Sequence, residues 1–233
     1  MVRALASLPA WRLGVLFAIA IGAVLATASV RPAAAAVKAE ELVEESRFTV
    51  ERMLSDPEMP EARQVVEKAH GVLIIPELVK GGFILGAEGG SGVLLVRGSD
   101  GTWSSPAFYT LLAGSVGLQI GGQVAEVIFA LMNDGAVNAF MGNEFKLGGD
   151  LSIAVGPLGR GVEASTTTNL GVDIYAYSRA VGLFGGGALE GAKILTRQDL
   201  NDEYYGAVAP PREIVMERKF INRNADALRK ALP

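Results

Sequence analysis

The chain has 233 residues, of which 50% are hydrophobic and 20% are charged, with 29 glycines, one histidine and no cysteine. This length is sufficient for one domain with a substantial core. The lack of cysteine excludes disulfide scaffolds, thiolate zinc sites, iron–sulfur clusters and thiol nucleophiles. The single histidine, His70, leaves no pair of histidines for a metal site, and we expect neither a metal nor a cofactor.

The N-terminus predicts a cleavable signal peptide over residues 1–36. Two arginines precede the uncharged apolar stretch Leu13–Thr27, and a run of small residues ends at Ala36. We therefore expect a protein that is exported to the periplasm or secreted. The alternative is an uncleaved membrane anchor, because the uncharged segment Leu13–Val30 just reaches the length that spans a bilayer.

The remaining chain is acidic. The first 36 residues carry three arginines and no acid, which leaves 18 basic and 25 acidic residues and a net charge of −7 for the rest. Nucleic-acid-binding proteins present a basic face, so the composition argues against a nucleic-acid partner.

Residues 37–70 predict two helices. Apolar or small residues recur at helical spacing on the first, with glutamates on its other side and Phe48 pointing away from the apolar stripe. The second helix is expected to begin near Pro57 or Pro60 and to end at His70, with Gly71 as a left-handed cap. The expected buried positions are Ala39, Leu42, Val43, Ser46, Val50, Met53, Leu54, Met59, Ala62, Val65, Val66 and Ala69.

The segment from Gly71 to Gly191 holds 26 of the 29 glycines and predicts many short strands. Such a pattern is typical of an antiparallel sheet or barrel, and glycine within strands indicates bends, bulges or close approach of two backbones. Turns are expected at Asp100-Gly101 and Asn133-Asp134-Gly135. The expected strands are 72–75, 82–90, 92–97, 107–112, 115–120, 124–132, 147–155, 163–168, 172–178 and 187–195, with a short helix at 136–141.

The chain becomes charged again after residue 191. We expect a short helix over 197–206 that Gly206 ends, a break at Pro210-Pro211, and one or two helices over 212–232. The predicted fold is α+β, with a glycine-rich antiparallel sheet or barrel-like core and flanking helices at both ends. Residues 37–206 would form the main domain, and 207–233 a C-terminal helical extension.

The sequence offers no catalytic constellation. Gly186 and Gly191 are spaced as in a phosphate-binding loop, but Lys193 comes one residue late and no serine or threonine follows it. The Ser104-Ser105 pair lacks the context of a nucleophile elbow. We therefore expect a binding protein and not an enzyme.

Basic residues of the glycine-rich segment are the candidate contacts for an anionic lipid head group. They lie beside glycines, where a backbone can approach a ligand closely. The alternative is scattered surface charge, which contributes little. These lipid-binding candidates are Lys80, Arg97, Arg160, Arg179 and Lys193.

Several motifs in a fixed order resemble the SYLF domain, also called the Ysc84 actin-binding domain. They are Gly90-Ser91-Gly92, Asp100 to Pro106, Gly121-Gly122-Gln123, Leu147 to Arg160, Tyr175 to Arg179, Gly182 to Gly186 and Glu190-Gly191. The positions that carry the resemblance are Gly90, Gly92, Trp103, Pro106, Gly121, Gly148, Gly149, Gly156, Pro157, Gly159, Tyr177, Ser178, Gly182, Phe184 and Gly191.

The resemblance implies a non-catalytic lipid-binding module. Eukaryotic members bind phosphoinositide membranes, partly through an N-terminal amphipathic segment, and some bind actin. Here export would make actin an improbable partner, and six acids against three basic residues over 37–56 oppose docking of the first helix on an anionic surface. We expect membrane phospholipid as the partner. The alternative is an envelope scaffold that binds another protein or itself.

Overall fold

The computed structural model describes most of the chain after residue 30. The described residues are 31–82, 85–116, 121–142, 144–147, 151–155, 172–180 and 191–233. The expected signal segment up to residue 30 and the expected strand at 163–168 lie outside them.

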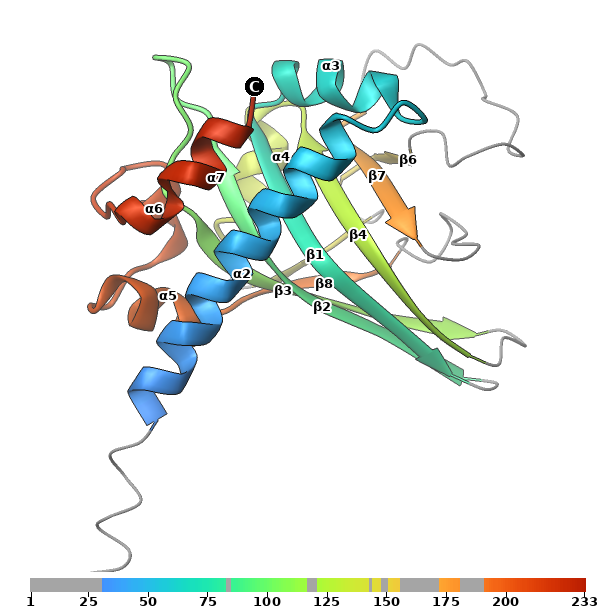
Figure 1. The fold of residues 1–233 in the computed structure, drawn as a ribbon, viewed down its shortest axis with the longest axis horizontal. Helices are drawn as coiled ribbons and strands as arrows, with labels where there is room; N and C mark the ends of the chain where they lie inside the picture. The colour runs from blue at the N-terminus through green and yellow to red at the C-terminus, as the bar shows by residue number, and fades with distance from the viewer. Residues whose placement is uncertain are drawn as a thin grey trace, which may run out of the picture.

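Eight strands form one curled sheet in the order β5-β8-β3-β2-β1-β4-β7-β6 (Figure 1). All neighbours pair antiparallel except β6 and β7, which pair in parallel. The α+β prediction with a glycine-rich sheet is confirmed. The bounds are β1 (Gly71–Gly82), β2 (Leu85–Val96), β3 (Ala107–Val116), β4 (Gly121–Leu131), β5 (Glu144–Lys146), β6 (Ile153–Val155), β7 (Ile174–Ala180) and β8 (Lys193–Thr196).

The four central strands are longer than the sequence predicted. Strand β1 continues past Pro76, because a register shift between Ile75 and Leu78 accommodates the proline without ending the ladder. The two pieces expected at 82–90 and 92–97 form the single strand β2. Of the strand expected at 147–155, residues 148–150 lie outside the described residues, and the rest forms β6 and an isolated bridge between Leu147 and Leu151.

Helix α2 (Arg31–Leu54) lies across one face of the sheet, and α3 (Pro60–Lys68) follows it (Figure 1). The predicted stripe is confirmed, since Ala39, Leu42, Val43, Ser46, Val50, Met53 and Leu54 are all buried. They pack on the strand side chains of this face, which include Val72, Ile74, Val93, Phe108 and Ile128. The opposite face buries a second apolar cluster around Leu73, Leu94, Tyr109, Val127 and Phe129.

The expected glycine cap after α3 was wrong. Ala69 already has an extended backbone, and Gly71 does not adopt a positive φ but opens β1 directly. A Cβ at Gly71 would lie 3.2 Å from Leu131 Cδ1 and 3.3 Å from the Leu95 carbonyl oxygen, so tight packing explains this glycine. His70 Nδ1 lies 2.7 Å from Asp134 Oδ1 at the start of α4 (Asp134–Ala139).

The C-terminal helices return to α2. Helix α5 (Gln198–Tyr205) ends at Gly206 with φ 69°, as expected, and is followed by α6 (Pro211–Val215), the 3₁₀ turn η2 (Arg223–Ala225) and α7 (Asp226–Ala231). Side chains of α5 and α7 share the apolar cluster of α2. Within the part of the chain that is described, no helix combines the length and apolarity needed to cross a bilayer.

Candidate functional site

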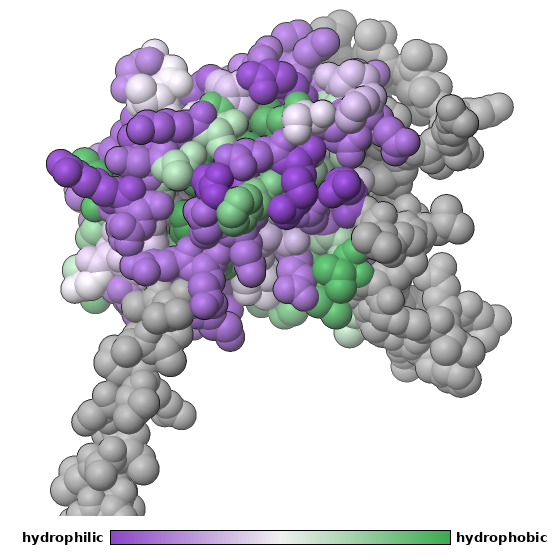
Figure 2. All heavy atoms as spheres, in the orientation of Figure 1, coloured by the Kyte–Doolittle hydropathy of each residue, from purple (hydrophilic) through white to green (hydrophobic). Residues whose placement is uncertain are grey.

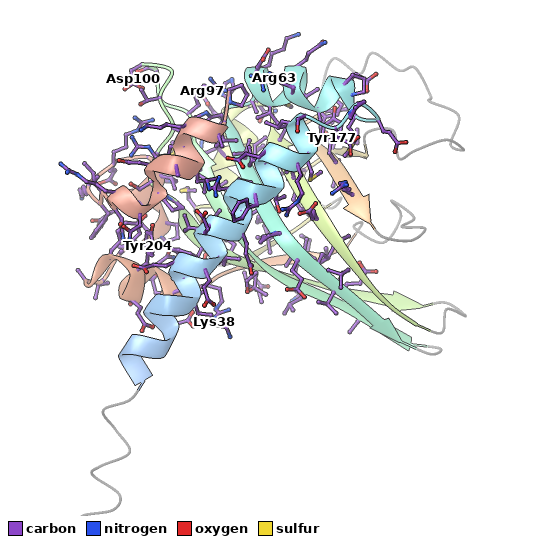
Figure 3. All side chains as sticks on the ribbon, viewed as in Figure 1. Lys38, Arg63, Arg97, Asp100, Tyr177 and Tyr204 are labelled. Carbon is purple, nitrogen blue, oxygen red and sulfur yellow. The ribbon has the colours of Figure 1, made fainter. Side chains whose placement is uncertain are left out.

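Arg97 is held inside the fold. Its guanidinium donates hydrogen bonds to the carbonyls of Ala69 (3.3 Å), Val66 (3.2 Å) and Pro233 (2.9 Å), and it stacks 4.3 Å from the centre of the Trp103 ring. Figure 3 shows Arg97 beside the end of α7 and α3. Burial lowers the pKa of this guanidinium from its ordinary value. These contacts bind the C-terminal segment to the sheet and leave Arg97 few donors for a ligand.

Arg179 belongs to an ion-pair network between the sheet and α2. It lies 3.3 Å from Asp56 Oδ2 and 3.5 Å from Glu126 Oε2. Glu126 also accepts hydrogen bonds from Thr49 Oγ1 at 3.0 Å and from Arg52 Nε at 2.9 Å. The Glu126 hydrogen bond raises the pKa of Arg52. The network fixes α2 on the sheet, although half of the Arg179 side chain stays exposed.

Among the remaining basic candidates, Lys193 is the one whose side chain is described, and it does not join Arg97 or Arg179 in one cluster. Lys193 on β8 is half exposed and lies 3.6 Å from Glu144. Five strand spacings separate β8 from β7, about 24 Å along the sheet at 4.8 Å each. Lys80 stands opposite Glu88 in the β1–β2 ladder, and Arg160 lies outside the described residues. A head-group role for Lys80, Arg97, Arg160, Arg179 and Lys193 stays a prediction.

Gly90 and Gly92 provide room for the irregular part of β1. A Cβ at Gly92 would lie 2.3 Å from the Ile74 carbonyl oxygen, and one at Gly90 would lie 2.5 Å from the Glu77 carbonyl oxygen. Real Cβ atoms do not approach backbone oxygens so closely. These two positions of the family motif therefore support the register shift of β1, as the prediction of close backbone approach requires.

Most of the other described motif positions also serve packing. Trp103 is buried and donates from Nε1 to the Pro233 carbonyl at 3.1 Å, and the Pro106 carbonyl accepts from Tyr205 Oη at 2.6 Å. Tyr177 and Ser178 are buried on β7, Gly121 begins β4, and Gly191 has φ 81°. The motif positions outside the described residues are Gly148, Gly149, Gly156, Pro157, Gly159, Gly182 and Phe184.

The central strands project past the helices at one end of the sheet (Figure 1). We call this part the open end; it comprises residues 79–82, 85–89, 112–116 and 121–124. It contains only two charged residues, Lys80 and Glu88, which stand opposite each other in register. The sequence connecting these strands, residues 83–84 and 117–120, adds no charge. The open end thus has far fewer charged residues than the acidic helix α2.

Three aliphatic side chains at the open end are exposed, and the sequence analysis did not single them out. Val79 is 46% exposed, Leu112 is 45% exposed and Val124 is 47% exposed. Figure 2 shows apolar surface where the strands project past α2. Periodicity places apolar residues on alternate positions of a strand, but it does not reveal which positions a helix leaves uncovered. The structure shows that these three positions are uncovered, and the register between the strands places them side by side.

Several polar groups of the described residues stabilise the fold. None of these residues form a group of three or more histidine, aspartate or glutamate side chains suited to a metal ion. Asp173 accepts hydrogen bonds from Ser152 and Asn133, which hold the pKa of its carboxyl below the ordinary value. Burial raises the pKa of Tyr177 to about 12.

Comparison with known proteins gives one family. Residues 112–233 match the Ysc84 family, described as "Las17-binding protein actin regulator". The chain is 36% identical to "Protein YSC84" of Saccharomyces cerevisiae over 173 residues, which cover 72% of this chain and 36% of the yeast protein. It is 35% identical to the human "SH3 domain-containing YSC84-like protein 1" over 171 residues, 73% of this chain and 49% of the human protein.

A third relative, "LAS seventeen-binding protein 3" of Saccharomyces cerevisiae, is 37% identical over 147 residues, 61% of this chain and 31% of that protein. The chain thus spans half or less of the length of these relatives. The family description names an actin regulator, and the third relative is named for binding LAS seventeen. This naming is at odds with the expectation that actin is an improbable partner.

Proposed function

The chain belongs to the Ysc84 (SYLF) family, and on that premise we propose that it is a non-catalytic module that attaches to phospholipid membranes in the cell envelope. The observation that carries the proposal is the open end of the sheet, a surface almost free of charge on an otherwise acidic protein. Apolar surface of this kind marks sites for membranes or partners. The export signal predicted from residues 1–36 supports the envelope location.

The absence of catalysis is part of this proposal. Relatives carry names of regulators and interaction proteins. The sequence contains no nucleophile elbow, phosphate-binding loop or thiol. The most strongly shifted pKa values among the described residues have structural causes, such as the burial of Tyr109 and the contacts of Arg47 with Glu44 and Glu51 within α2.

Vesicle co-sedimentation tests the proposal directly. The purified protein is mixed with vesicles of phosphatidylcholine alone and of phosphatidylcholine with phosphatidylglycerol, at low and at physiological salt. We expect the protein in the pellet with both compositions, because the open end needs no anionic lipid for apolar contact. Failure to sediment with either composition at low salt refutes the proposal.

Binding to another protein is the second candidate, and the family description favours it. Filamentous actin in place of vesicles provides the matched assay. Sedimentation with actin and not with vesicles would assign the chain to this function. Sedimentation with vesicles alone would support the lipid proposal.

A further inference from the structure

We propose that the helix-bearing face of the open end is the surface that contacts lipid, and that it seats in the bilayer interface by apolar contact and not by head-group charge. This inference rests on the proposed function, since it names the surface of that same activity. It differs from the expectation drawn from the sequence, which placed lipid binding at dispersed basic residues.

The three exposed aliphatic residues form one continuous row. Leu112 stands opposite Gly89, Gly89 opposite Val79, and Val79 opposite Val124 in the three ladders. Along β3 and β4, Leu112 and Val124 lie an even number of residues from Phe108 and Ile128, which pack beneath the helices. Side chains alternate between the two faces of a strand, so this aliphatic row lies on the face that carries α2.

A row of small residues follows toward the tip. Gly114 stands opposite Ala87, Ala87 opposite Gly81, and Gly81 opposite Gly122. In the next row on the same face, Leu85 stands opposite Val116. The residues of these rows are therefore small or aliphatic, and none of them carries a charge.

The dimensions of the open end fit the interfacial region of a bilayer. Three residues separate the aliphatic row at Val79 from the end of β1 at Gly82, about 10 Å at 3.3 Å per residue. Apolar faces of interfacial proteins bury themselves about 5–10 Å into the boundary between head groups and acyl chains. The open end can reach this depth without crossing the bilayer.

Helix α2 determines the orientation in which the sheet can approach a bilayer. A packed helix rises about 10 Å above a sheet, so α2 prevents a flat surface from lying along the whole face. Residues 37–56, most of them in α2, carry a net charge of −3, which opposes contact with anionic lipid. The protein must therefore enter end-on, with its strands pointing into the membrane and α2 in water.

Cations stand at both lateral borders of the aliphatic row. Lys193 is opposite Leu112 on one side. Arg179 is opposite Glu126, two positions from Val124, on the other. Both side chains are about half exposed, and each has an acidic partner. At the borders of the aliphatic row, Lys193 and Arg179 can lie at the level of the lipid phosphates. Their acidic partners limit the net attraction of these cations to the phosphates.

The alternative occupant is a second copy of the chain. A two-fold dimer through this face would bring two acidic α2 helices close to each other, and juxtaposed like charges oppose association. A bilayer does not bring a second acidic helix against α2. Lipid is therefore the occupant that the charges favour.

The test compares matched triple variants of the full chain. In the first, Val79→Thr, Leu112→Thr and Val124→Thr make the aliphatic row polar with threonine, a β-branched residue that favours strands. In the control, Val208→Thr, Met216→Thr and Ile221→Thr change three exposed apolar residues near α6. Partitioning of the first variant into phosphatidylcholine vesicles should fall about 30-fold or more, from the loss of three half-exposed aliphatic contacts. The control should bind like the natural protein.

A second measurement does not depend on loss of binding. Val79→Trp places a fluorophore in the aliphatic row, and Val208→Trp places one near α6. Brominated phosphatidylcholine should quench the first and not the second. Lys193→Gln should change binding less than threefold, and raising the salt concentration should have a similarly small effect.

The outcomes separate the two proposals. If the natural protein binds no vesicles, the proposed function fails. If it binds, but the aliphatic-row variant binds equally well and Val79→Trp is not quenched, this inference alone is overturned. It is also overturned if the row variant converts a dimer into a monomer in sedimentation velocity while vesicle binding is unchanged.

Discussion

Replacing Gly92 by alanine should destabilise the sheet strongly. The added Cβ would lie 2.3 Å from the Ile74 carbonyl oxygen and 2.8 Å from Ile75 Cγ1. Ordinary contacts begin near 3.4 Å, so β1 and β2 must separate by about 1 Å at the centre of the sheet. Overpacking of this kind costs about 1–3 kcal/mol. Alanine also restricts the unfolded chain, which returns about 0.4–1 kcal/mol.

The expected net loss for Gly92→Ala is about 2 kcal/mol, because backbone in the middle of the sheet cannot move aside as a flexible side chain can. Gly114→Ala is the matched control, since a Cβ there meets nothing within 4 Å. This control should leave stability unchanged or raise it by up to about 1 kcal/mol.

Thermal unfolding followed by far-UV circular dichroism measures both variants. For a domain of this size, a loss of 2 kcal/mol corresponds to a fall of about 4–8 °C in Tm. Equal midpoints for Gly92→Ala and Gly114→Ala would refute the packing explanation of the glycine motif. A destabilised control would show that glycine is required at the open end for a different reason.

Three further changes test the structural contacts. Trp103→Phe removes the hydrogen bond to the Pro233 carbonyl and should lower the free energy of unfolding by about 1 kcal/mol. Amide hydrogens of α7 should exchange faster, and unchanged exchange would contradict the anchoring of α7 by Trp103. Asp173→Asn should destabilise the protein at pH 7 and have no effect in acid. Hydrogen bonds such as that from Ser152 lower the pKa of the Asp173 carboxyl in the folded state below its ordinary value of 3.8. The stability that they confer is therefore present above pH 3.8 and is lost as the pH falls through the pKa of the folded state. A difference in unfolding midpoint that persists at pH 2 would oppose this assignment. Glu126→Gln should lower the free energy of unfolding by about 1 kcal/mol, measured by thermal unfolding. The loss is modest because the half-exposed arginine partners of Glu126 can regain water. An unchanged stability would mean that water fully replaces the ion-pair network.

Local periodicity was sufficient to predict the helices. The stripe from Ala39 to Leu54 repeats at helical spacing over four turns, and every predicted position is buried. Gly206 was also predicted correctly, because a left-handed cap depends only on neighbouring residues. The outline of the fold follows from such local signals.

Contacts between distant segments could not be predicted in this way. Arg97 resembled a free surface cation, but its partners include Val66 and Pro233, which are remote in the sequence. The aliphatic row was hidden for the same reason. Val79, Leu112 and Val124 come from three strands, and only the register of the ladders unites them.

The meeting of α2 with α5 and α7 joins the beginning of the described chain to its end, and Asn224 Nδ2 even donates to Glu40 Oε1 at 2.8 Å. A polypeptide that lacks residues 198–233 leaves the apolar stripe of α2 without these partners. Packing of this cluster must therefore wait until α7 has been synthesised.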